Sequence, residues 1–157
     1  MAIEEGATLP EVELTAPDDT RIKLRDYVGK PLVVYFYPKD DTPGCTREAQ
    51  EFGEALPTFD ALGCALLGIS QDKPAKHQKF IAKYDLAVPL ASDEDGTVLA
   101  AFGTWIEKQL YGKTYMGIDR STFLFGADGK LFRAWRRVRV PGHVIDVLES
   151  IKEMQAR

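Results

Sequence analysis

Two short apolar runs, separated by one helix-length segment, constrain the fold of this chain more than any other feature. They are PLVVYFY at 31–37 and CALLGIS at 64–70, and the first is rich in β-branched and aromatic residues. Runs of this length are typical of strands buried on both faces. Between them Ala49, Phe52 and Phe59 recur at helical spacing. A strand–helix–strand unit crosses over right-handedly and pairs its strands in parallel, which predicts an α/β fold.

The remaining patterns extend this unit in both directions. Pro57 is expected to kink or end the helix that starts near Cys45. The other predicted elements are a half-buried strand at 20–24, helices opening at Pro74 and Pro141, a strand at 88–92, a short helix at 97–102, and a hairpin at 121–135 around Asp128-Gly129. This order of elements is that of a thioredoxin-like α/β domain, in which reactive groups lie at the carboxyl ends of parallel strands.

Two histidines and a group of arginines have structural interpretations. His77 lies on the apolar face of its predicted helix and is expected to pack there, and His143 is expected to be exposed at a helix start. Four arginines follow one another closely and are interpreted as a solvated strand face, with a docking surface for an acidic partner as the alternative: Arg133, Arg136, Arg137 and Arg139.

Length and charge limit the classes of protein to consider. The 157 residues suit one domain, expected to span 1–157, with a core large enough to need no disulfide or metal. The net charge of −4 argues against nucleic acid or an anionic membrane as a partner. The opening MAIEEGATLP has no apolar signal region, and no run approaches the length of a membrane span. We therefore expect a cytoplasmic protein with reduced cysteines.

The stretch PKDDTPGC at 38–45 places a cysteine just past the first buried strand. A thiol reacts as its thiolate, and unpaired N–H groups and the macrodipole at a helix start stabilise a thiolate. Thr42 supplies a hydroxyl three residues before Cys45, and the turn at Pro43-Gly44 could bring it back toward the sulfur. Glu48 would oppose a thiolate, so the site needs a cation to offset its charge.

The segment YFYPKDDTPGCTRE resembles the peroxiredoxins, specifically the bacterioferritin comigratory protein (PrxQ) branch. Further matches recur along nearly the whole chain: LPEVELTAPDD, LLGISQD, YMGIDRSTFLF and WRRVRVPGHVIDVL. The resemblance implies a thioredoxin-like fold, with a central mixed sheet flanked by helices and an N-terminal β extension. It also implies a thiol-dependent peroxidase that needs no metal or organic cofactor.

The resemblance assigns roles to residues that match the family pattern. Cys45 would be the nucleophile that attacks a peroxide oxygen and becomes a sulfenic acid. Thr42 would hydrogen-bond the peroxide through its hydroxyl, and the backbone N–H groups of Gly44 and Cys45 are further donors. Pro38 would shield the sulfenate from water.

Two charged residues complete the implied site. Arg120 in DRSTF would stabilise both the thiolate and the negative charge that develops on the leaving oxygen. Glu48 matches the acid that orients this arginine, which answers the charge conflict at the helix start.

The chain departs from the family at the resolving cysteine. Many relatives carry it five residues after the first cysteine, where this chain has Gln50, and others carry it on the next helix, where PAKHQKFIAKYD has none. Only Cys64 remains. A helix from Cys45 to residue 62 would separate its ends by roughly 26 Å, whereas disulfide Cα atoms lie within about 7 Å. The prediction is a one-cysteine mechanism, with thioredoxin, glutaredoxin or glutathione as external reductant.

Several alternatives stay open. Cys64 could form a disulfide between chains, act as a resolving cysteine, or be a buried strand residue. A thioredoxin-type disulfide oxidoreductase needs a C-x-x-C pair, but CTRE ends in Glu48. A non-catalytic peroxide sensor or binding module is the alternative from a different class. The resemblance implies a monomer.

Overall fold

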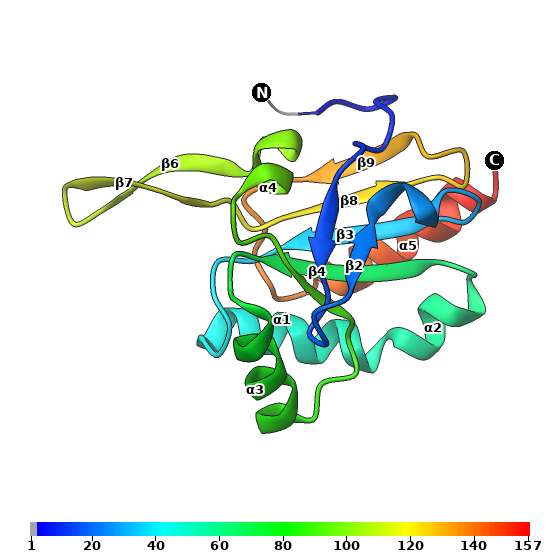
Figure 1. Cartoon of the computed structure of the whole chain (residues 1–157). Helices are drawn as coiled ribbons and strands as arrows, with labels where there is room; N and C mark the ends of the chain where they lie inside the picture. The colour runs from blue at the N-terminus through cyan, green and yellow to red at the C-terminus, as the bar shows by residue number, and fades with distance from the viewer. Residues whose placement is uncertain (1–2) are drawn as a thin grey trace.

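The computed structural model describes residues 3–157, and its centre is a seven-stranded mixed sheet (Figure 1). The strand order is β2-β1-β5-β4-β3-β8-β9, and two further strands, β6 and β7, pair only with each other. The strands are β1 (Glu13–Thr15), β2 (Arg21–Lys23), β3 (Leu32–Phe36), β4 (Ala65–Ser70), β5 (Leu90–Ser92), β6 (Trp105–Leu110), β7 (Lys113–Ile118), β8 (Ser121–Phe125) and β9 (Leu131–Trp135).

Helices follow the strands as the sequence pattern predicts. The helices are η1, a 3-10 turn (Leu24–Tyr27), α1 (Pro43–Glu54), α2 (Leu56–Ala61), α3 (Pro74–Tyr84), α4 (Thr97–Phe102) and α5 (His143–Gln155). Within residues 3–157 we find no helix that is long and apolar enough to cross a membrane.

The predicted strand–helix–strand unit is confirmed. β3 and β4 pair in parallel from Leu32 opposite Ala65 to Phe36 opposite Ile69. Every residue of β3 is buried, because both faces of the sheet are covered. β8 and β9 then add antiparallel strands beside β3, which confirms the predicted hairpin. The Gly129 of that hairpin has a φ of 77°, a backbone conformation that glycine adopts without strain.

Alternate residues of β3 point into two separate apolar cores. Val33 and Tyr35 pack with residues of α1, α2, α3 and α5. Val34 and Phe36 pack instead with α4, η1 and β1 on the opposite face. The expected N-terminal β extension is also confirmed, because β1 pairs with β2 and with the sheet strand β5.

The expected break at Pro57 is confirmed. α1 ends at Glu54, and α2 begins at Leu56 with the proline in its first turn, where no N–H is needed. A proline inside one continuous helix would remove a backbone hydrogen bond. Dividing the helix lets Phe52 and Phe59 both reach the same core.

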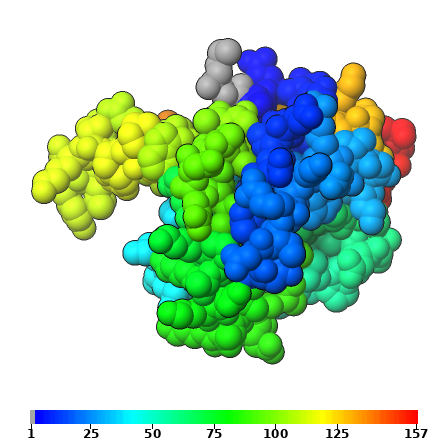
Figure 2. Space-filling view, viewed as in Figure 1, coloured from blue at the N-terminus to red at the C-terminus, as the bar shows by residue number. Residues whose placement is uncertain are grey.

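The arm formed by β6 and β7 is an element that the sequence pattern missed. It projects from the rest of the molecule, drawn in yellow-green in Figures 1 and 2. Its side chains are mostly exposed on both faces, up to 95% for Tyr111 at the tip. Without a buried face, the arm lacks the alternation of apolar and polar residues that identifies a strand.

Two expectations about side chains are wrong. His143 is buried rather than exposed, because the first turn of α5 lies against β8 and its Nε2 is 2.7 Å from Thr122 Oγ1. The arginines do not form a face of one strand, since β9 ends at Trp135. Arg133 hydrogen-bonds Ser150, and Arg136 donates to the carbonyl oxygens of two residues at the end of α4, Phe102 and Gly103.

Candidate active site

Cys45 lies in the first turn of α1, just beyond the carboxyl end of β3. Thr42 is the N-cap of this helix in an extended conformation, and Pro43 takes the first helical position, where its missing N–H costs nothing. The cysteine is therefore close to the unpaired N–H groups of the helix start, as the sequence predicts. Its residue surface is 2% exposed, so only a small part of the cysteine reaches solvent.

Arg120 brings Cys45 and Glu48 together. Its Nη2 donates to Cys45 Sγ at 3.2 Å, and its Nη1 donates to Glu48 Oε1 at 2.6 Å. The arginine precedes β8, which is the neighbour of β3 in the sheet, so the topology delivers it to the start of α1. These three residues are thus adjacent in space although 72 to 75 positions separate the arginine from the other two.

Burial and mutual contact shift the pKa values of Glu48 and Arg120. Burial raises the pKa of the Glu48 carboxyl to about 7, and the Arg120 guanidinium acts in the opposite direction. Although burial also disfavours the charge of Arg120, Glu48 and Cys45 raise its pKa above the usual range. The guanidinium is therefore a permanent cation beside the sulfur. Glu48 Oε2 is buried and has no hydrogen-bond partner in the described part of the chain.

Gly44 lies directly against this arginine. A Cβ atom added at Gly44 would be 3.2 Å from Arg120 Nη2, which is closer than most real Cβ contacts. The glycine thus leaves the space in which the guanidinium reaches the sulfur.

Two residues implied by the resemblance lie on the same loop but make other contacts. Thr42 Oγ1 donates to the carbonyl oxygen of Lys39 at 2.9 Å. Pro38 is exposed on the loop that follows β3. The structure therefore joins Cys45, Glu48 and Arg120 by hydrogen bonds. Thr42 lies one residue before α1, the helix that carries Cys45 and Glu48.

The surroundings of the site include residues that the sequence analysis did not select. Tyr35 is fully buried, and this burial raises the pKa of its hydroxyl well above the usual value. The charges of Glu48 and Cys45 act in the same direction. Its ring covers Gly68 of β4, where a Cβ would meet it at 2.5 Å. The arm leads directly into the site, because β7 ends at Ile118, two residues before Arg120.

The two cysteines lie far apart. Cys64 directly precedes β4, beside the start of β3, whereas Cys45 follows the end of β3. The paired part of β3 alone spans roughly 13 Å at the usual strand rise, and a disulfide needs Cα atoms within about 7 Å. Cys64 is buried, and this burial raises the pKa of its thiol to about 12. Gln50 is exposed on α1.

Comparison with known proteins places the chain in a family. The model of the AhpC/TSA family matches residues 6–134. The chain belongs to the AhpC/TSA family. It is 43% identical to peroxiredoxin Bcp of Bacillus subtilis over the full length of both chains, and 44% identical to peroxiredoxin Bcp of Xanthomonas campestris over 96% of this chain and 94% of the relative.

Solved structures agree with this assignment. A cysteine-to-serine variant of PrxQ from Xylella fastidiosa superposes with a TM-score of 0.93, at 39% identity over 99% of each chain. The bacterioferritin comigratory protein of Xanthomonas campestris superposes with a TM-score of 0.89, at 42% identity over 96% of this chain and 99% of that one. The protein is therefore a peroxiredoxin of the bacterioferritin comigratory protein (PrxQ) branch, with the thioredoxin-like fold and a thiol-dependent peroxidase activity.

Proposed function

We propose that Cys45 is the residue that reduces the peroxide. Its thiolate attacks one oxygen of the hydroperoxide, a sulfur–oxygen bond forms, and the oxygen–oxygen bond breaks. The sulfur becomes a sulfenic acid, and the leaving oxygen takes a proton and departs as water or an alcohol. The observation that carries this proposal is the hydrogen bond from Arg120 to the Cys45 sulfur, supported by Glu48.

Each neighbour has a role in this step. The Arg120 guanidinium stabilises the thiolate and the charge on the leaving oxygen, and it does so in a nearly dry site where such interactions are strong. Glu48 orients the guanidinium through the bond to Nη1. Thr42 turns its hydroxyl from Lys39 toward the bound peroxide, the N–H of Gly44 is a further donor, and Pro38 limits the access of water to the sulfenate.

Resolution of the sulfenic acid requires an external thiol. An incoming thiol replaces the hydroxyl of the sulfenic acid, which leaves as water, and forms a mixed disulfide with Cys45. A second thiol then releases Cys45 and carries the disulfide away. This one-cysteine mechanism is supported by the distance between Cys45 and Cys64 and by the burial of Cys64. Thioredoxin, glutaredoxin and glutathione are the candidate reductants.

The proposed substrates are hydrogen peroxide and organic hydroperoxides. A solved structure of the Xanthomonas campestris relative is described in terms of its alkyl peroxide reduction activity. We also propose that the enzyme acts in the cytoplasm as a single-domain monomer over residues 1–157. The net charge of −4 supports a partner other than nucleic acid or an anionic membrane.

The deciding experiment is intact-mass analysis after one equivalent of hydrogen peroxide, with and without dimedone. Wild type and Cys64→Ala should both form a dimedone adduct that Cys45→Ser lacks. Both should also consume peroxide at equal rates when an external thiol is supplied. A wild-type protein that instead loses two hydrogens and resists dimedone would show that Cys64 resolves the sulfenate. If neither product forms, Cys45 is not the peroxidatic residue.

A further inference from the structure

The loop between β3 and α1 is held in place by α3 and by Asp72, which lies just before that helix. The backbone N–H of Asp40 donates to Asp72 Oδ2 at 2.8 Å. The next residue, Asp41, has a φ of 62° and accepts a hydrogen bond from Lys83 Nζ at 2.8 Å. These contacts fix the backbone directly before Thr42, the N-cap of the helix that carries Cys45.

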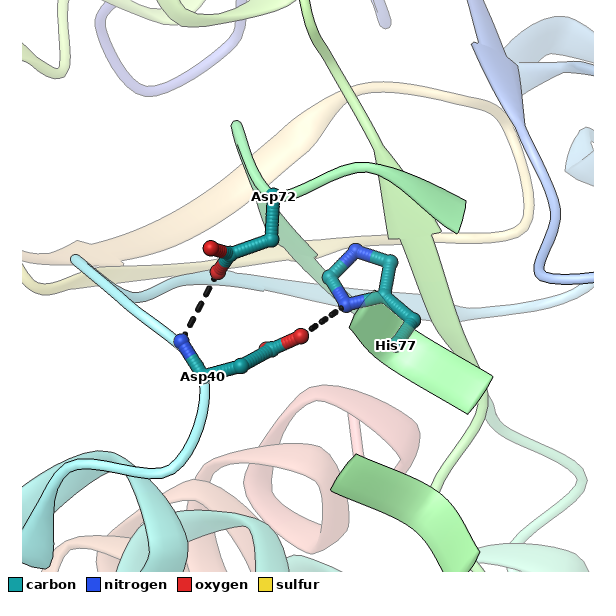
Figure 3. Close-up of side chains that lie close together, drawn as sticks. All are labelled: Asp40, Asp72 and His77. Atoms are coloured by element: carbon teal, nitrogen blue, oxygen red, sulfur yellow. Dashed lines mark hydrogen bonds and ion pairs between the residues drawn. The ribbon is translucent and has the colours of Figure 1, made fainter. Parts of the chain in front are cut away.

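His77 of α3 supplies the most deeply buried of these contacts. Its Nδ1 lies 2.6 Å from Asp40 Oδ2 (Figure 3). Both side chains are excluded from solvent. Tyr37, directly after β3, donates its hydroxyl to the other oxygen of Asp40 at 2.6 Å. The peroxidase step described above uses none of these three side chains.

The hydrogen bonds around His77 occupy both of its ring nitrogens. Nε2 lies 3.1 Å from the carbonyl oxygen of Ala91, which can only accept, so Nε2 carries a proton. Nδ1 contacts Asp40 Oδ2, while the other oxygen of Asp40 accepts from Tyr37. His77 thus links helix α3 and β5 to the loop that contains Asp40.

The same cluster also has the spacing of a metal site, since ligand atoms of Asp40, Asp72 and His77 lie within 4.8 Å of one another. Its acceptors are already occupied, however. Lys76 Nζ lies 2.9 Å from Asp72 Oδ1, and Ser70 donates to Asp72 Oδ2. A metal ion would have to displace the lysine and break the contact between Asp40 and His77, so the contacts favour a structural network over a cation site.

We propose that His77 is a positioning residue of the peroxidase, which holds Asp40 and thereby the loop that presents Thr42 and Cys45. Asp40 lies two residues before Thr42 and five before Cys45. Because the loop leads straight into the first turn of α1, a shift of Asp40 moves the turn that meets the peroxide. Displacements of about 1 Å can slow an enzymatic step about 100-fold. This inference rests on the proposed role of Cys45.

Two substitutions of His77 each keep one of its two hydrogen bonds and remove the other. In His77→Asn the amide N–H takes the place of Nδ1 and keeps the contact to Asp40. In His77→Gln the longer side chain places its amide where Nε2 lies and keeps only the contact to Ala91. The measurement is the rate constant for oxidation of Cys45 by hydrogen peroxide, followed by rapid quenching, dimedone labelling and mass analysis.

We expect His77→Asn to stay within about 3-fold of the wild-type rate constant, and His77→Gln to fall about 10- to 100-fold. Leu14→Ala removes a buried side chain from the core on the opposite face of the sheet and serves as the control for stability. It should lower the melting temperature and leave the rate constant unchanged.

Equal rate constants for His77→Asn and His77→Gln, whether normal or reduced, would overturn the proposal. Failure of the proposed function would look different, because Cys45 of the wild type would then form no dimedone adduct.

Discussion

At the scale of single residues, the site depends on one guanidinium that makes two different contacts. Arg120 donates to a carboxylate through one nitrogen and to the Cys45 sulfur through the other. A lysine presents a single point charge and cannot form this fork. The arrangement needs room as well as charge, and the absent side chain of Gly44 provides that room.

The prediction at this scale concerns Gly44→Ala. The added Cβ would approach Arg120 Nη2 to 3.2 Å and push it from the sulfur, while the backbone N–H of residue 44 is retained. We expect peroxide to oxidise Cys45 about 10- to 100-fold more slowly. The free energy of unfolding of the variant should be no lower than that of the wild type, because alanine favours a helix by up to about 1 kcal/mol over glycine.

Gly53→Ala in the same helix is the matched control. Its added Cβ would meet backbone atoms of Ala87 and Val88 only at 3.6 Å, an ordinary contact. It should leave the oxidation rate unchanged. A wild-type rate in Gly44→Ala would contradict the role given to the space beside Arg120.

At the scale of elements, three helices converge on the end of the sheet where Cys45 lies. α1 carries the cysteine, α3 holds the preceding loop, and α5 begins beside β8 with His143 at its first position. The His143 ring also lies edge-on to Phe52 of α1 at 6.1 Å between ring centres. His143 thereby fixes α5 against both the sheet and α1.

This contact predicts a pH dependence of stability. Burial lowers the pKa of His143 to about 4; Arg120 acts in the same direction, and Asp146 opposes both. An unfolded histidine binds its proton near pH 6.5, so between pH 6.5 and 4 the unfolded state holds more protons than the folded one. The free energy of unfolding should therefore fall as the pH drops through this window, by about 3 kcal/mol from this residue.

His143→Gln tests this dependence, because glutamine can hydrogen-bond Thr122 but does not titrate. Urea unfolding across pH 4 to 6.5 should give a shallower loss of stability in the variant than in the wild type. Identical slopes would show that His143 is not the residue responsible.

At the scale of the whole molecule, the two thiols occupy opposite ends of the sheet. Cys45 lies past the carboxyl ends of the central strands, whereas Cys64 is buried at the amino end of β4. In the folded state the two thiols are therefore too far apart for a disulfide, which supports the proposed one-cysteine mechanism.

This separation predicts sensitivity to excess peroxide. A sulfenate without a neighbouring thiol remains exposed to a second oxidation. With a large excess of hydrogen peroxide and no reductant, Cys45 should accumulate as sulfinate, detected by intact mass and peptide mapping. Adding an external thiol beforehand should suppress it. A protein that stays at the sulfenate or disulfide level would contradict the one-cysteine mechanism.

Much of this architecture could be predicted from sequence because the central strands are buried on both faces and the turns carry proline or glycine. β3, β4, the break at Pro57 and the hairpin at Gly129 all depend on local chemistry. The arm escaped prediction because it has no buried face. The burial of His143 depends on a contact to Thr122, which lies 21 positions away in the chain and leaves no local signal.

The near-complete burial of Cys45 has a consequence for the timing of the catalytic cycle. In the proposed mechanism the same sulfur meets a peroxide of a few atoms and then a thiol attached to a much larger body. Because only 2% of Cys45 is exposed, we expect the larger partner to reach the sulfur only after the first turn of α1 opens. Under this proposal, the oxidised enzyme should accumulate whenever peroxide arrives faster than the turn opens.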